Sequence, residues 1–149
     1  MRLETICLLL LVTGCATVPP RAPVHVTTNA LLTQRAVLTI RGRQFSLTGY
    51  LALSETNGMR LIMTSSLGQM MADVLVKPDG AVYLMRPSPA LRREWIERYV
   101  AGDMRRFSES PTPDLSIKDR NHTLELRTVE TKPGPQPAEL FDETKTPKK

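Results

Sequence analysis

Residues 45–86, FSLTGYLALSETNGMRLIMTSSLGQMMADVLVKPDGAVYLMR, decide the fold that we expect. From 45 to 54, apolar and polar residues alternate at period two around Gly49, which is typical of a strand with one buried face. Three more apolar runs follow, at 59–64, 69–77 and 81–85. Asn57-Gly58 and Pro78-Asp79-Gly80 supply turns between them. Connections this short join antiparallel neighbours, so the stretch predicts a four-strand meander.

The segments around this meander predict three more strands and one helix. A strand at 36–41 precedes it, and a last hairpin is expected from strands at 115–118 and 123–129. Between them, Ser88 before a proline predicts the N-cap of a helix that runs to about Phe107, with Trp95 on its apolar stripe. The fold class expected is α+β: a curved antiparallel sheet forming an incomplete β-barrel, with one amphipathic helix on its concave face.

Strands 69–77 and 81–85 carry apolar residues on both faces, whereas a sheet with one wet face alternates cleanly. One face is expected to bind the helix while the other covers a second apolar surface. Unbranched thioethers suit a surface that fits variable acyl chains, although methionine equally fills gaps in a core. The predicted lining of an apolar cavity is Met59, Leu61, Met63, Met71, Leu75, Met85, Trp95 and Tyr99.

The N-terminus reads as a secretory signal: a charged start and a short apolar run precede Leu11-Val12-Thr13-Gly14-Cys15. This sequence resembles the bacterial lipobox, in which cleavage leaves the cysteine as an acylated N-terminus; an ordinary signal peptide is the alternative. The resemblance implies palmitate-type acylation of Cys15, and Ala16 after it implies the outer membrane. We therefore expect an outer-membrane protein on the periplasmic face, held by its acyl anchor.

Composition divides the chain into four parts. Residues 1–14 are the expected lipoprotein signal peptide and 15–29 an acylated, Pro-rich tether. Residues 30–129 form the expected sheet-and-helix domain. The end of the chain, 130–149, mixes Pro, Glu, Thr and Lys and reads as a disordered tail.

The formal net charge is +5, and arginines 21, 35, 41 and 43 all precede Glu55, the first acid after the predicted cleavage site. Attraction to anionic head groups is one interpretation, and solvated strand ends are the other. Binding of nucleic acid is not expected, because basic and aromatic residues do not interleave in this exported chain.

The residue pattern does not favour an enzyme. Cys7 would leave with the signal and Cys15 would carry lipid, while His25 and His122 have no partner at a recognisable catalytic spacing. No catalytic residue, metal ligand or cofactor is therefore expected. Asp73 is the unusual carboxylate, inside an apolar strand, and is interpreted as an edge-strand charge that deters pairing.

Residues 60–68, RLIMTSSLG, together with Gly49 and the strand at 69–76, resemble the outer-membrane lipoprotein receptor LolB and its superfamily. In that receptor a leucine protrudes from a Pro-Leu-Gly loop, and an incomplete barrel encloses a cavity for acyl chains. Leu67-Gly68 matches the Leu-Gly pair, and Ser66 stands in the place of the proline. The resemblance covers about 45–85 and implies that Leu67 and Gly68 contact the membrane or a cargo.

Two functions are thus expected, and both are of the binding kind. The preferred one is binding acyl chains or lipidated proteins, as lipid or lipoprotein ligands, and assisting their transfer or insertion. The alternative is a structural or accessory envelope lipoprotein that docks a protein partner without binding lipid. An open apolar pocket between helix and sheet favours the first, and a filled space favours the second.

We expect Cys15→Ala to release the protein from the membrane, because Cys15 is the residue that would be acylated after cleavage. Palmitate labelling and membrane fractionation measure this. A variant that still sediments with the outer membrane would show that the lipobox interpretation is wrong.

Overall fold

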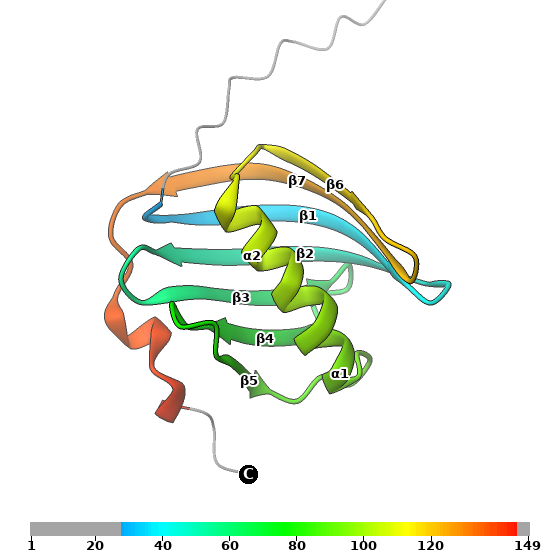
Figure 1. Cartoon of the computed structure of the whole chain (residues 1–149), viewed down its shortest axis with the longest axis horizontal. Coiled ribbons are helices and arrows are strands. Elements are labelled where there is room, and N and C mark those ends of the chain that lie inside the picture. The colour runs from blue at the N-terminus through cyan, green and yellow to red at the C-terminus, as the bar shows by residue number, and fades with distance from the viewer. Residues whose placement is uncertain (1–27, 146–149) are drawn as a thin grey trace, which may run out of the picture.

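The computed structural model describes residues 28–145, which form one antiparallel sheet, one helical stretch and two short C-terminal turns (Figure 1). The strands are β1 (Ala30–Ile40), β2 (Arg43–Ser54), β3 (Gly58–Ser65), β4 (Met70–Val76), β5 (Val82–Arg86), β6 (Asp114–Lys118) and β7 (His122–Pro133). The helical stretch is α1 (Arg93–Trp95), η1 (Ile96–Val100) and α2 (Ala101–Glu109), and the turns are η2 (Ala138–Phe141) and η3 (Glu143–Lys145).

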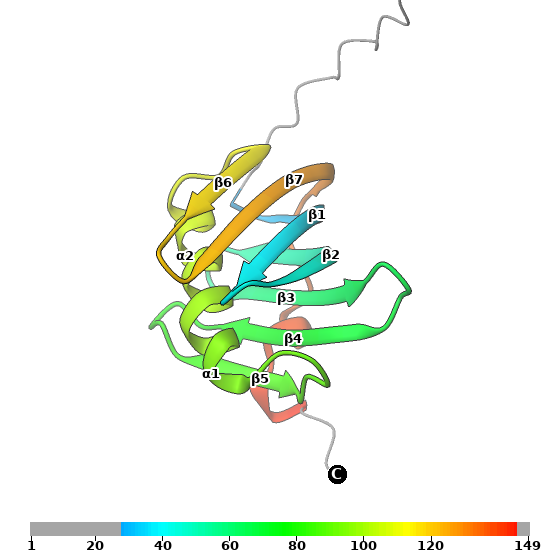
Figure 2. The same ribbon diagram turned by 90° about the vertical axis from the view of Figure 1, so that its right-hand side faces the viewer.

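The seven strands lie in the order β5-β4-β3-β2-β1-β7-β6, and every neighbouring pair is antiparallel. The predicted meander is confirmed as β2 to β5. The strand expected at 36–41 is longer, since β1 begins at Ala30 and pairs along its length with both β2 and β7. The α+β class is therefore correct. The incomplete barrel is not formed, because the sheet is neither closed nor strongly curled (Figures 1 and 2).

One helix of 17 residues crosses one face of the sheet, starting at Arg93 and not at the expected Pro89 (Figure 2). The Ser88 Oγ does accept backbone N–H bonds, at 3.3 Å from Ala90 and 2.8 Å from Leu91. These bonds close a turn that ends before the helix begins. The middle of the helix, η1, is π-helical, so the apolar stripe is carried through one wider turn.

The face of the sheet under the helix holds the main core. Trp95 is 7% exposed, as the four-residue spacing of the apolar stripe predicts, and Ile96, Met104 and Phe107 are buried beside it. From the sheet, side chains such as Leu32 and Val74 face them. Burying large apolar side chains at about 1.5 to 3 kcal/mol each makes this contact the main attraction between helix and sheet.

The opposite face of the sheet is covered in part by the C-terminal turns, where a disordered tail was expected. Phe141 is 2% exposed and packs in a second apolar cluster with Ala52, Leu75 and Met85. The Lys77 Nζ donates a hydrogen bond of 2.7 Å to the Phe141 carbonyl oxygen. Residues 138–145 are thus folded against the sheet, because their few apolar side chains find an apolar site there.

Within the described residues, no helix is long and apolar enough to cross a membrane.

We expect Phe141→Ala to lower the free energy of unfolding by about 3 to 5 kcal/mol, as truncation of a buried aromatic side chain does. Urea denaturation measures this. The matched control is Leu140→Ala. The Leu140 side chain is next to Phe141 in sequence and only half-buried, so its truncation should lower the free energy of unfolding by less. A loss below about 1 kcal/mol for Phe141→Ala would support a disordered tail.

Candidate functional site

The space between helix and sheet, where the predicted acyl-chain cavity would lie, is small. Its volume is about 50 Å³. Pockets that hold small organic ligands usually measure about 300 to 1,000 Å³. Its lining residues are mostly apolar: Gln34, Ala36, Leu38, Leu47, Gly49, Leu51, Leu61, Met63, Val100, Asp103, Met104, Phe107, Leu124 and Leu126. The core side chains therefore fill most of the room beneath the helix.

The eight predicted cavity residues divide between the two faces of the sheet. Six of them belong to the core between helix and sheet, namely Met59, Leu61, Met63 and Met71 from the sheet and Trp95 and Tyr99 from the helix, but only Leu61 and Met63 line the small cavity. Leu75 and Met85 were assigned to the cavity wrongly. Leu75 alternates with Val74 and so points to the opposite face. Met85 alternates with Leu84, which packs on the helix side, and so joins Leu75 in the second apolar cluster.

Gly49 explains why any cavity is left. A Cβ atom at this position would lie 3.2 Å from Leu61 Cδ1, in contact closer than side chains usually make. Gly49 therefore leaves a gap in the floor of the sheet, which opens onto the buried Gln34. The buried Gln34 amide donates a 3.3 Å hydrogen bond to Thr128 Oγ1 across the β1–β7 pair, so this polar group does not stand unpaired.

The turn between β3 and β4 holds Leu67 in solvent. Its side chain is 85% exposed, and Gly68 beside it adopts a φ of 78°. The Ser65 Oγ accepts the backbone N–H of Leu67 at 3.3 Å and that of Gln69 at 3.2 Å. The backbone N–H of Ser65 donates to the Gln69 carbonyl oxygen at 2.8 Å. The predicted contact residues Leu67 and Gly68 thus sit on a turn closed by several hydrogen bonds.

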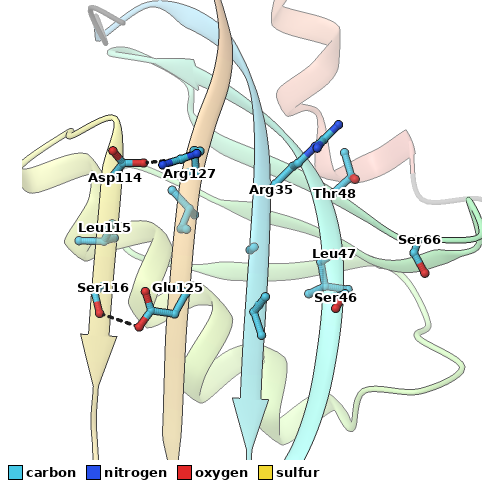
Figure 3. Close-up of a pocket in the computed structure, with 13 residues that line it drawn as sticks. Arg35, Ser46, Leu47, Thr48, Ser66, Asp114, Leu115, Ser116, Glu125 and Arg127 are labelled. Carbon is cyan, nitrogen blue, oxygen red and sulfur yellow. Dashed lines mark hydrogen bonds and ion pairs between the residues drawn. The ribbon is translucent and has the colours of Figure 1, made fainter. Parts of the chain in front are cut away.

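A wide groove of about 810 Å³ lies on the face of the sheet away from the helix, over β2, β1, β7 and β6 (Figure 3). Polar and charged side chains from all four strands stand among apolar ones in its lining. The Arg127 Nε donates to Asp114 Oδ1 at 3.1 Å, and the Ser116 hydroxyl bonds to Glu125 at 3.0 Å. Arg35 lies across from Arg127 in the β1–β7 register. Desolvating these charges would be costly, so the groove does not suit an acyl chain.

Asp73 is not the edge-strand charge that was expected. Strand β4 lies between β3 and β5, and Asp73 is buried there. The Arg60 guanidinium donates to both of its oxygens, at 2.9 and 2.8 Å. These bonds raise the pKa of Arg60 above its ordinary value, although burial opposes them. A third donor of Arg60 reaches the Leu140 carbonyl oxygen at 2.9 Å, so the pair also fastens the C-terminal turns.

A second buried polar pair, Asp103 and His122, was missed because its members lie 19 residues apart on different elements. The His122 Nε2 lies 3.1 and 3.2 Å from the two Asp103 oxygens, and the His122 ring stacks on Tyr99 with centroids 4.6 Å apart. Burial raises the pKa of Asp103 above its ordinary value, opposed by the hydrogen bond from His122. The helical period did contain a signal for its burial, because Asp103 lies within one turn of Tyr99 and Met104 on the apolar side of the helix.

The predicted lipidation residue, Cys15, lies outside the described residues, as do the signal peptide and most of the tether.

No family model, curated protein or solved structure matches this chain.

We expect the free energy of unfolding of the wild type to fall relative to that of Asp103→Asn as pH rises. A raised folded pKa means that the contribution of this carboxyl is fully present below the unfolded pKa, about 3.9, and is lost as pH rises through the folded pKa. The asparagine cannot titrate and keeps a hydrogen-bonding oxygen for His122. Urea denaturation from pH 3.5 to 5.5 measures the difference, and parallel curves would contradict a buried carboxyl.

Proposed function

We propose that this chain is a lipid-anchored envelope protein that engages acyl chains at its surface, either those of a membrane or those of a lipidated partner. The observation that carries the proposal is the presentation of Leu67. An apolar side chain that is 85% exposed gains about 1.5 to 3 kcal/mol when an apolar phase covers it. The hydrogen-bonded turn holds it in place before contact, so little conformational entropy is lost on binding.

The closed interior argues that the chain does not carry an acyl chain beneath its helix. A cavity of about 50 Å³ is far below the volume of known ligand pockets. Opening it would require the helix to leave a core that includes Trp95 and Phe107. We therefore propose that this chain shares the exposed Leu-Gly turn of LolB-like receptors. We do not propose that it shares their half-barrel or their enclosed site for an acyl chain.

A second candidate is an accessory envelope protein that docks a protein partner and touches no lipid. The filled space between helix and sheet favours it, since such a protein needs no internal room. In that case Leu67 would enter an apolar pocket on the partner. The two candidates differ in one respect: only the first requires Leu67 for binding to lipid vesicles that contain no protein partner.

We expect Leu67→Glu to weaken binding to phosphatidylcholine vesicles about tenfold, since the loss of one buried leucine side chain corresponds to 1.4 kcal/mol or more. The melting temperature should stay close to that of the wild type, because the side chain is exposed. The measurement is vesicle cosedimentation of the unacylated chain that begins at Ala16.

The matched control is Gln69→Glu, which adds the same charge to the same turn and leaves Leu67 in place. It should bind vesicles like the wild type, because the hydrogen bonds of Gln69 to Ser65 use backbone atoms. Equal vesicle binding by Leu67→Glu and wild type would remove the support for acyl contact and favour the protein-docking candidate. A large loss of stability in Leu67→Glu would contradict its place outside the core.

A further inference from the structure

Arginine side chains stack on the aromatic residues at the start of the helix. The guanidinium of Arg92 lies 5.5 Å from the centre of the Trp95 ring, and that of Arg43, from strand β2, lies 6.0 Å from it. Arg43 also lies 5.6 Å from the Phe45 ring. Contacts of this kind hold the cations at fixed places on the surface. Trp95 is thus approached by two guanidinium groups from separate elements.

The same arrangement continues toward the β6–β7 turn. Arg98 lies 5.7 Å from the Tyr99 ring, and Tyr99 stacks on His122. The residue before this histidine, Asn121, accepts the backbone N–H of Arg41 at 2.9 Å. We name Arg41, Arg43, Arg92 and Arg98 the basic patch. All four are exposed residues.

The charge of the basic patch is not neutralised locally. Among residues 28–145, no carboxylate lies within ion-pair distance of any of its four arginines. The nearby acids are used elsewhere: Glu97 binds Arg93 at 2.8 Å, and Asp119 binds Arg106 at 3.0 Å. Glu94 is the remaining acid on this part of the helix. Other arginines of the domain, such as Arg60 and Arg127, do have carboxylate partners.

The basic patch lies at one end of the sheet. Because the strands alternate in direction, the β1–β2, β3–β4 and β6–β7 connections all emerge at this end, on the right in Figure 1. Figure 2 shows the β3–β4 turn on the right, apart from the other two turns on the left. Strand β1 starts at the opposite end and spans about 37 Å with its 11 residues. From Cys15 to Thr28 the chain can reach at most about 45 Å. An anchor at Cys15 is therefore compatible with this end facing the membrane.

We propose that the basic patch binds an anionic phospholipid surface and turns this end of the domain toward it. Guanidinium groups bind phosphate oxygens through paired donors, and arginine near aromatic rings is suited to the boundary between water and lipid. The patch is distinct from Leu67, which lies on another loop. This inference rests on one part of the proposed function, the anchoring of the chain to a membrane. The competing occupant of the basic patch is an acidic protein surface.

The test uses the full acylated chain in vesicles that contain a dansyl-labelled head-group lipid, with Trp95, the single tryptophan, as energy donor. One vesicle type is phosphatidylcholine alone, and in the other about a third is phosphatidylglycerol. We expect energy transfer to rise about twofold or more with phosphatidylglycerol at about 0.05 M salt. The rise should disappear at about 0.5 M salt, because salt screens exposed charges.

Two matched double variants locate the effect. Arg41→Glu with Arg98→Glu should abolish the response to phosphatidylglycerol, and neither arginine is stacked on Trp95. Arg35→Glu with Arg127→Glu changes the net charge equally on the face away from the helix and should keep the response. The acyl-contact proposal is tested separately, on phosphatidylcholine vesicles without anionic lipid, so its failure and the failure of this one give different results.

Three outcomes would overturn the proposal. The first is a wild-type chain with equal energy transfer in both vesicle types. The second is a loss of the response in the Arg35 and Arg127 double variant, which would assign it to net charge alone. The third is a chain that ignores phosphatidylglycerol while polyglutamate shifts Trp95 emission, which would assign the basic patch to an acidic protein.

Discussion

Strands β3 and β4 bury apolar side chains on both faces, and the rest of the molecule depends on covering both. On one face Leu61 and Val74 lie under the helix. On the other, Leu75 lies under Phe141 of the C-terminal turns. The Arg60–Asp73 pair joins the two strands on this second face and holds the Leu140 carbonyl. A buried pair of this kind contributes little net energy when complete, but losing one partner is costly, so it defines one arrangement of the C-terminal turns.

Covering both faces has a functional consequence. The helix and the sheet meet through packed side chains, which leave about 50 Å³ around Gly49 and no room for an acyl chain. The binding that we propose therefore uses the surface. The described surface offers an exposed leucine on the β3–β4 turn, the basic patch at the same end of the sheet, and a polar groove on the face away from the helix. The first two together suit a boundary between apolar chains and anionic head groups.

Local sequence patterns predicted the strands and the helix well. They did not predict the contacts between residues that lie far apart in the sequence. Period-two alternation and the Asn57-Gly58 turn are local signals, and the meander follows from them. The partners of Asp73 and His122 lie on other elements, so no spacing rule could identify them. The fold of the tail depends on Phe141, a single aromatic in a polar segment, whose site exists only once β4 and β5 have paired. The face of Met85 was a local signal that was not used, because alternation with Leu84 already separates Met85 from the helix side of the sheet.

The central claim is that this domain binds at its surface and keeps its interior closed. Native mass spectrometry of the full chain, extracted from membranes in mild detergent, tests it most directly. The account predicts the mass of the chain with its own covalent acyl groups and no retained lipid, since about 50 Å³ cannot enclose an acyl chain. One phospholipid or lipopeptide retained per chain, and displaced when bulk is added at Gly49, would contradict it.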